Sequence, residues 1–325
     1  MTFVRTVLGD IPPGELGVTY AHEHLIIDGG RPVLMEPDFD LSDVERMTAE
    51  VASAAALGLS AAVDAMPCDA GRNAAKLAEL SRRTGVHIIA PTGLHHDRYY
   101  GSAHWSHRVS VAELAGLFIA DIVDGIDAYD YAGPVVRRTA HRAGIIKIAG
   151  SADRLSTRDA RVFEAAAIAH ARTGVPILTH CERGTGAAEQ LRFLMDHGVG
   201  ADHVILSHID KLVDRGLHRE LLGTGAVGEY DGSFRWKADE PNGTLQLLTW
   251  MLEDGLVDQI VLGMDAARQG YYRAYGGRPG LTWLLDGFSA AMEEHGLEAA
   301  VRHRLFLDNP ARVLMFASLP QGGAR

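Results

Sequence analysis

Two histidines one residue apart give the sequence its first chemical signal. His22 and His24 lie in a segment of extended character. Because side chains alternate with a period of two along a strand, both imidazoles project to the same side and can reach one metal ion. Such a pair also arises by chance in a chain with 16 histidines. A surface pair or a helix-capping pair is therefore the alternative interpretation.

Other reactive side chains share one context along the chain. Several short apolar runs indicate strands buried on both faces, and each ends near a side chain that can bind metal or react: Lys147, His180, His208 and Asp265. Taken singly, a buried histidine can be a hydrogen-bonded core residue, and an aspartate can cap a helix. Together with the histidine pair, these residues supply nitrogen and oxygen ligands that suit zinc, cobalt or manganese.

Lys147 is the unusual member of this set. It stands between Ile146 and Ile148 in a run that should be buried, where an ammonium group is costly and loses its proton more readily. A neutral lysine amine can add carbon dioxide and form a carbamate, whose two oxygens would bridge two cations. Two metals would then lower the pKa of a bridging water enough to give hydroxide at neutral pH. A lysine that reaches solvent at a strand end is the alternative.

The elements that carry these residues alternate between strand and helix. Strands are predicted to end at the first histidine pair and to span residues 60–65, 86–92, 144–149, 175–180, 203–207, 226–230 and 260–264, with helices between them. This pattern favours an α/β fold, a (β/α)8 TIM barrel formed as a single domain over residues 1–325. In a barrel the carboxyl ends of all strands meet at one mouth, so the candidate ligands would converge. A doubly wound open sheet is the alternative, but no Gly-rich phosphate loop follows the first strand.

Both ends of the chain are predicted to pack against this barrel. Residues 1–18 are expected to form an N-terminal hairpin, with runs 3–9 and 15–18 joined by a turn at Pro12-Pro13-Gly14. Residues 309–325 are expected to form a closing helix and tail. There Asn309 would cap the helix and Pro310 would be its first residue.

Composition and charge exclude several functional classes. The chain is 47% hydrophobic and 22% charged, which is typical of a globular protein, and its net charge of −11 argues against a nucleic-acid partner. No stretch approaches the roughly 20 apolar residues of a membrane span, and the first residues lack a signal-peptide pattern. Two cysteines in no metal-binding motif, Cys68 and Cys181, indicate free thiols. We therefore expect a cytoplasmic protein with no membrane partner.

Taken as a set, the motifs resemble the phosphotriesterase family of the amidohydrolase superfamily over nearly the whole chain. The matching pieces are Ala21-His22-Glu23-His24, Gly144-Ile145-Ile146-Lys147, Thr179-His180-Cys181-Glu182-Arg183-Gly184-Thr185, Leu206-Ser207-His208, Gly263-Met264-Asp265 and Asn309-Pro310-Ala311-Arg312. Cys181 departs from relatives, which often have another small or polar residue there.

This resemblance implies a hydrolase with two divalent metal ions, zinc first and cobalt or manganese as alternatives. His22, His24 and Asp265 would hold the more buried ion, His180 and His208 the more exposed one, and N6-carboxylated Lys147 would bridge them. The resemblance also implies that a metal-bridging hydroxide attacks the substrate, with Asp265 as the catalytic proton shuttle. Relatives are often homodimers, so a homodimer is expected.

The substrate must be inferred from the loops at the barrel mouth. Lys237, Arg268 and Tyr271 follow the seventh and eighth strands and are similar to the trio by which the phosphorylated sugar lactonase branch binds phosphate. Forked arginine donors, a lysine charge and a hydroxyl suit a dianion. We therefore expect a lactonase for a phosphorylated sugar lactone, a small anionic substrate. The alternative is that the two basic residues are solvated loop charges and that Tyr271 packs under its loop.

Rival functions are an N-acyl homoserine lactone lactonase, a phosphotriesterase that hydrolyses organophosphates, and a catalytically silent barrel kept as a binding protein. An acyl chain would need a hydrophobic channel, and aromatic residues near the mouth could line one. The sequence assigns no role to the remaining polar and aromatic loop residues: His95, His96, Arg98, Tyr99, Tyr100 and Trp236.

Overall fold

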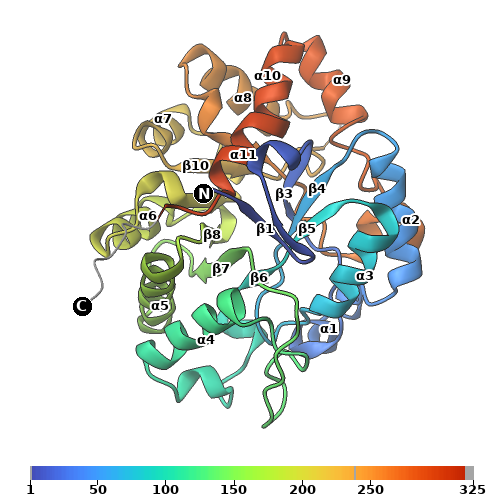
Figure 1. Cartoon of the computed structure of the whole chain (residues 1–325). Helices are drawn as coiled ribbons and strands as arrows, with labels where there is room; N and C mark the ends of the chain where they lie inside the picture. The colour runs from blue at the N-terminus through green and yellow to red at the C-terminus, as the bar shows by residue number, and fades with distance from the viewer. Residues whose placement is uncertain (1, 238, 319–325) are drawn as a thin grey trace.

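Parallel strands at the centre and helices around them carry the fold. The computed structural model of the chain describes residues 2–237 and 239–318. Its parallel strands are β3 (Thr19–Glu23), β4 (Ala61–Asp64), β5 (His87–Ile89), β6 (Pro91–Thr92), β7 (Ile145–Gly150), β8 (Ile177–Cys181), β9 (Val204–Ser207), β10 (Val227–Tyr230) and β11 (Ile260–Leu262). Figure 1 shows these strands surrounded by helices.

The strands close into a ring. They pair in the orders β3-β4-β5 and β6-β7-β8-β9-β10-β11, and only Ala90 separates β5 from β6, so these two form the third barrel strand together. At the other seam, the backbone N–H groups of Met264 and Asp265 donate to the carbonyl of His22, at 3.2 and 2.9 Å. The fold is therefore the predicted (β/α)8 TIM barrel of the α/β class.

Apolar side chains fill the barrel on both faces of its strands. One buried cluster inside the ring contains Ala61, Ile145, Leu178, Ile205 and Val261, one from each of five strands, and a larger cluster packs the outer strand faces against the helices. Burial on both faces explains why the strands read as continuous apolar runs rather than as alternating ones.

The helices alternate with the strands, and capping residues in the sequence mark helix ends. They are α1 (Gly30–Met35), α2 (Val44–Ala55), α3 (Ala74–Thr84), α4 (Val111–Val123), α5 (Thr157–Thr173), α6 (Ala187–Asp196), α7 (Arg215–Gly223), α8 (Gly243–Glu253), α9 (Gly287–Glu294), α10 (Ala299–His303) and α11 (Asn309–Val313). For example, Ser156 and Asp159 form a capping box at the start of α5, and Gly174 ends that helix with a φ of 72°.

The N-terminal hairpin differs from the prediction. Strand β1 (Val4–Thr6) pairs antiparallel with β2 (Gly9–Ile11), so the turn lies at residues 7 and 8 and not at the Pro12-Pro13-Gly14 segment. Pro13 begins a short 3-10 helix instead. Proline lacks the N–H that a strand partner needs and suits the first position of a helical turn, which explains why the chain leaves the hairpin at Pro12 and Pro13. The carbonyl of Val18 then accepts from the N–H groups of Ser60 and Ala61 instead of pairing with β1.

The closing segment also differs from the prediction. Asn309 has helical backbone angles and follows α10 through a π-helical turn over Arg304–Asp308, so it is not a helix cap. Its side-chain amide donates to the carbonyls of Val257 and Ile260 at 3.0 and 2.7 Å, which attaches the closing helices to β11. In Figure 1, β1 and α11 lie in front of the barrel strands. Residues 319–325 of the predicted tail lie outside the described residues, and the single-domain boundary stays a prediction.

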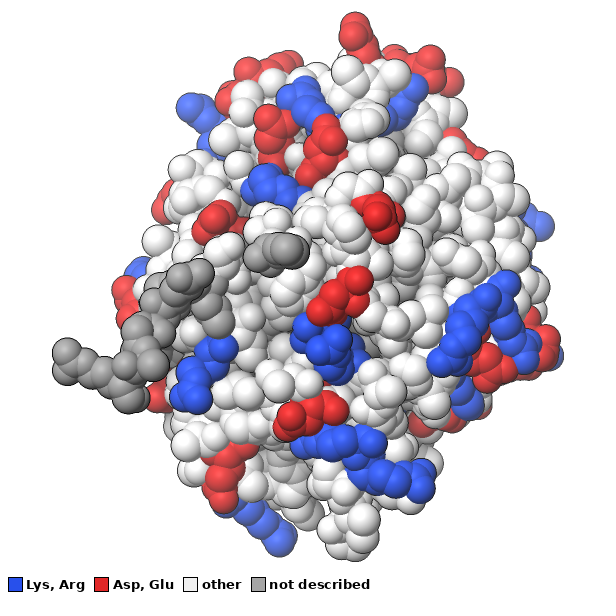
Figure 2. Space-filling model, in the orientation of Figure 1, with Lys and Arg blue, Asp and Glu red and all other residues white. Residues whose placement is uncertain are grey.

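Charges of both signs share the surface. On the face in Figure 2, basic and acidic side chains are interspersed and no extended basic region is visible. Within the described part of the chain, the helices are too short or too polar to cross a bilayer.

The amide of Asn309 gives a test of this attachment. Asn309→Ala leaves two buried carbonyls without their donor, so we expect the free energy of unfolding to fall by about 2 kcal/mol in a urea titration. The neighbouring Asp308→Ala removes a side chain that is 60% exposed and should cost less than about 0.5 kcal/mol. Equal losses in the two variants would contradict this account.

Candidate metal centre

The strand ends bring all six predicted ligands into one cluster. His22 lies on β3, Lys147 on β7 and His180 on β8. His24 and His208 directly follow β3 and β9, and Asp265 is the third residue after β11. The Nε2 of His22 is 3.2 Å from the Nζ of Lys147, and the Nε2 of His24 is 3.2 Å from Asp265 Oδ1. The convergence expected from the barrel topology is present.

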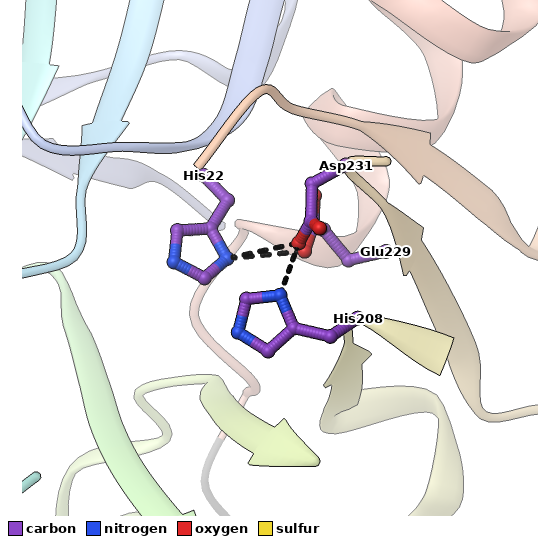
Figure 3. Close-up of side chains that lie close together, drawn as sticks. All are labelled: His22, His208, Glu229 and Asp231. Carbon is purple, nitrogen blue, oxygen red and sulfur yellow. Dashed lines mark hydrogen bonds and ion pairs between the residues drawn. The ribbon is translucent and has the colours of Figure 1, made fainter. Parts of the chain in front are cut away.

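Two buried carboxylates orient the histidines from behind. Figure 3 shows Glu229 and Asp231 facing His22 and His208. The Nδ1 of His22 lies 3.0 Å from Glu229 Oε2, and the Nδ1 of His208 lies 2.5 Å from Asp231 Oδ2. A carboxylate fixes the proton of an imidazole on the nitrogen that it contacts. Both rings therefore direct an Nε2 lone pair toward the centre of the cluster.

The third ring, His180, gives a test of whether a cation fits here. Its Nδ1 lies 2.8 Å from His208 Nε2, and its Nε2 lies 2.9 Å from Glu182 Oε2. A proton on Nε2 leaves two lone pairs facing each other across the first contact, whereas a proton on Nδ1 leaves a lone pair facing the carboxylate. An imidazolium would satisfy both contacts, but burial and the nearby His208 hold the pKa of His180 well below its usual range. A cation between the rings resolves this conflict, so the donor set fits a metal.

Lys147 is fully buried in the centre of the cluster. Burial lowers the pKa of its ammonium group to about 8, although the acidic side chains of Asp265 and Glu229 act in the opposite direction. About a tenth of the amine is therefore neutral at pH 7, far more than for an exposed lysine. This is the form that carbamate chemistry requires.

Two of the candidate ligands have left-handed backbone conformations. His208 and Asp265 have φ angles of 67° and 49°, in a region that is uncommon for residues other than Gly but that Asn, Asp and His adopt several-fold more often than other side chains. The hydrogen bond from the Asp265 N–H to the His22 carbonyl helps to hold the second of these conformations.

Arg235 is a site residue that the sequence did not indicate. Its Nη2 donates to the carbonyl and to Oδ2 of Asp265, at 2.6 and 3.1 Å, and its Nη1 donates to the carbonyl of Asp231 at 2.9 Å. Burial works to raise the pKa of Asp265, but Arg235 and His208 hold it well below the usual range. Asp265 is therefore kept ionised by a guanidinium outside the ligand cluster.

A cavity of about 560 Å³ opens above this cluster. His22, His24, His180 and Asp265 form part of its lining, and Arg98, Arg183, Lys211, Arg235 and Arg268 add basic side chains. These five basic residues come from loops that follow five different strands. The mouth of the cavity is therefore rich in positive charge beside the candidate ligands.

The three predicted phosphate-binding residues do not come together. Arg268 and Tyr271 line the cavity; Arg268 contacts Glu36 at 2.5 Å and lies over the ring of Phe39. The side chain of Lys237 is 74% exposed and pairs with Glu240 at 3.0 Å. Among the described residues, the cavity lining does not include Lys237.

Of the loop residues to which the sequence assigned no role, some line the cavity and others pack beneath or beside it. His95, Arg98 and Tyr99 line the cavity, whereas Tyr100 is buried beneath the loop and hydrogen-bonds to the Cys68 carbonyl. His96 approaches Glu182 Oε2 at 2.9 Å. The indole N–H of Trp236 donates to Thr244 Oγ1, which directs this ring away from the cavity lining.

Sequence reasoning missed the carboxylates that hold the histidines. Glu229 and Asp231 follow the apolar pair Val227 and Gly228 in the seventh barrel strand, and both are fully buried. A buried acid in a strand is as costly as a buried lysine. Glu229 and Asp231 could therefore have been identified from the sequence on the same ground as Lys147.

With this geometry established, known proteins provide a comparison. A model of the phosphotriesterase family matches residues 2–314. The chain belongs to the phosphotriesterase family. The family is binuclear and metal-dependent, and this member has clusters of histidine and carboxylate side chains that could hold metal, such as His22 with His24 and Asp265. It is a hydrolase.

Individual relatives of this phosphotriesterase-family member align over almost their full length. A phospho-furanose lactonase of Mycoplasmopsis synoviae (strain 53) is 33% identical over 97% of this chain and 92% of that protein. The crystal structure of an amidohydrolase from Mycoplasma synoviae has a TM-score of 0.94 at 32% identity and covers 98% of this chain and 93% of its own. The phosphotriesterase homology protein of Escherichia coli, solved with phosphate in its active site, has a TM-score of 0.84 at 28% identity, with coverages of 92% and 99%.

The carboxylates behind the histidines lead to a prediction about metal affinity. Asp231→Asn and Glu182→Gln each remove the charge that fixes one imidazole, so we expect metal affinity to fall about 10- to 100-fold. Metal content after dialysis against a graded chelator series measures this. Glu240→Gln, a matched change at a surface position that is 48% exposed, should keep the wild-type metal content. Full retention of metal by Asp231→Asn would show that the carboxylate does not support the site.

Proposed function

We propose that this hydrolase is a lactonase that opens a small phosphorylated sugar lactone. The observation that carries the proposal is the cavity, where the basic side chains of Arg98, Arg183, Lys211 and Arg268 surround a cluster of metal-ligand residues. A dianionic phosphate would pair with this charge while the lactone ring reaches the cluster below. The name of the Mycoplasmopsis synoviae relative, phospho-furanose lactonase, supports the same substrate class.

Two divalent ions are part of the proposal, zinc first and cobalt or manganese as alternatives. His22, His24 and Asp265 would hold one ion, His180 and His208 the other, and N6-carboxylated Lys147 would bridge them. When bound, such ions withdraw charge from a carbonyl oxygen and make water acidic enough to attack at neutral pH.

The proton path follows from the environment of Asp265. Its Oδ1 faces His24 at 3.2 Å and its Oδ2 accepts from Arg235. Because Arg235 keeps the carboxylate in place and ionised, Asp265 can accept the proton of the attacking water and pass it to the departing ring oxygen. Water adds to the carbonyl carbon, the ring C–O bond breaks, and the product is a hydroxy acid that keeps its phosphate.

Phosphate recognition is assigned to Arg268 and Tyr271, and Lys237 remains the third proposed residue. Arg268 carries a forked donor group whose present partner, Glu36, also lines the cavity. A phosphate would compete with Glu36 for this guanidinium. Lys237 would have to exchange its partner Glu240 in the same way.

A cytoplasmic location and a homodimer complete the proposal. The two cysteines are free and buried, as expected in a reducing compartment. Light scattering on the purified protein would test the dimer.

A substrate panel tests the proposed function. With enzyme of known metal content, we expect phosphorylated sugar lactones to be hydrolysed with kcat/KM at least 100-fold above plain sugar lactones, acyl homoserine lactones and a phosphotriester. Arg268→Ala should raise KM for the phosphorylated lactone about 10-fold or more and leave turnover of the plain lactone unchanged, because it removes a charge-assisted contact to phosphate alone. Lys237→Ala tests the third residue in the same way, by comparing KM for the phosphorylated lactone with turnover of the plain lactone. Equal activity on phosphorylated and plain lactones would refute phosphate recognition.

The carbamate can be tested separately. Enzyme exchanged into carbon-13 bicarbonate with zinc should show a carbamate carbon signal by NMR, because Lys147 presents a neutral amine near neutral pH. Lys147→Gln should lose this signal and bind fewer metal ions. A signal that persists in Lys147→Gln would come from another amine and would contradict the assignment.

A further inference from the structure

His95 lies in the cavity wall and has no part in the chemistry described so far. It belongs to the loop that follows β6, and its ring centroid is 5.1 Å from that of His180 and 4.7 Å from the ring of Tyr99, which it meets edge-on. It lines the same cavity as His22, His24 and Asp265. The residue is therefore beside the reacting centre, yet it is not one of the predicted ligands.

Three hydrogen bonds fix the position of His95. Its backbone N–H donates to the hydroxyl of Tyr100 at 2.8 Å, and that hydroxyl donates to the Cys68 carbonyl at 3.0 Å. Its carbonyl accepts from Arg158 Nη1 at 2.7 Å. Tyr100 is itself buried, so this support comes from inside the protein and does not depend on the exposed parts of the loop.

A fourth hydrogen bond fixes the tautomer of the ring. The backbone N–H of His96 donates to Nδ1 of His95 at 2.7 Å, so Nδ1 is an acceptor and a neutral ring carries its hydrogen on Nε2. The structure gives this Nε2–H no acceptor among the described residues. The neighbouring His96 differs in its place, because its Nε2 is buried 2.9 Å from Glu182 without the geometry of a hydrogen bond. Among the described residues, the cavity lining includes His95 and not His96, so His95 is the one of the two with a donor in the cavity wall.

We propose that His95 is a catalytic residue whose Nε2–H donates a hydrogen bond to the lactone carbonyl oxygen as that oxygen gains negative charge. This inference rests on the proposed lactonase function. When water adds to the carbonyl carbon, the C=O electron pair moves to the oxygen, and the donor stabilises it; when the ring C–O bond breaks, that pair returns. His95 neither gains nor loses a proton, since Asp265 carries the proton to the departing ring oxygen.

The fixed position explains why this donor would be effective. A donor that is already oriented needs no reorganisation during the reaction, and removal of one oxyanion donor typically costs about 100- to 1000-fold in kcat. A hydrogen bond that strengthens only as charge develops changes kcat and has little effect on KM. Substitution of a histidine that only packs in the cavity wall would not lower kcat while leaving KM nearly unchanged.

Four variants separate donation from packing. His95→Phe keeps the ring shape and removes the donor, and His95→Asn places its amide near Nδ1, whereas His95→Gln brings an amide N–H to the depth of Nε2. We expect Phe and Asn to lower kcat on the phosphorylated lactone about 100-fold with KM within about 3-fold, and Gln to recover at least 10-fold of that loss. His107→Phe, the same change at a ring that contacts Asp97, is the control and should retain wild-type kcat. Thermal unfolding and metal content should match wild type in all four.

Binding of two inert analogues provides a readout apart from turnover. A phosphorylated cyclic phosphonate carries negative charge on the oxygens of a tetrahedral centre, whereas the phosphorylated lactam has a neutral carbonyl, so calorimetry should show that wild type prefers the phosphonate and that His95→Phe loses most of this preference. If wild type opens the lactone but His95→Phe stays within 2-fold in kcat and keeps the preference, the donor role is refuted and the lactonase remains. If wild type opens none of the lactones, the proposed function is refuted, and the role of His95 with it.

Discussion

The placement of protons on the buried imidazoles is the constraint on which the site depends. Glu229 and Asp231 take one nitrogen of His22 and His208, and Glu182 takes one of His180. The other nitrogen of each ring must then present a lone pair to its neighbours. Rings arranged in this way repel one another unless positive charge lies between them, so the carboxylates behind the histidines create the demand for a cation as well as the ligands for it.

The barrel satisfies this constraint because each strand end contributes only one or two side chains to the cluster. Parallel strands place their carboxyl ends at the same rim, and the loops that follow carry the basic residues of the cavity. Apolar packing on both strand faces leaves the rim as the place where polar side chains can accumulate. Loop residues can therefore change the substrate while the ligand cluster below stays unchanged.

The sequence predicted the barrel and the six candidate ligands because both depend on local patterns. The apolar runs that end in His180 or His208 can be recognised in the sequence without knowing which distant residues they contact in the fold. The missed features depend on contacts between segments far apart in the chain. Arg235 is indistinguishable from other loop arginines until it meets Asp265, and the amide of Asn309 could not be assigned to the carbonyl of Ile260 from spacing alone. The hairpin turn was misplaced because Pro12 and Pro13 are equally typical of a turn and of the start of a short helix.

His22 has two roles whose combination affects how the protein reaches its native state. Its imidazole faces Lys147, and its carbonyl accepts the two N–H groups that join the last barrel strand to the first. More than 200 residues separate these two strands in the chain. A folding intermediate with an open sheet would lack both the seam and the pocket between His24 and Asp265. Capture of the ion that His22, His24 and Asp265 would hold would then be confined to chains that have already closed the ring, and that ion, once bound, would slow the reopening of the seam.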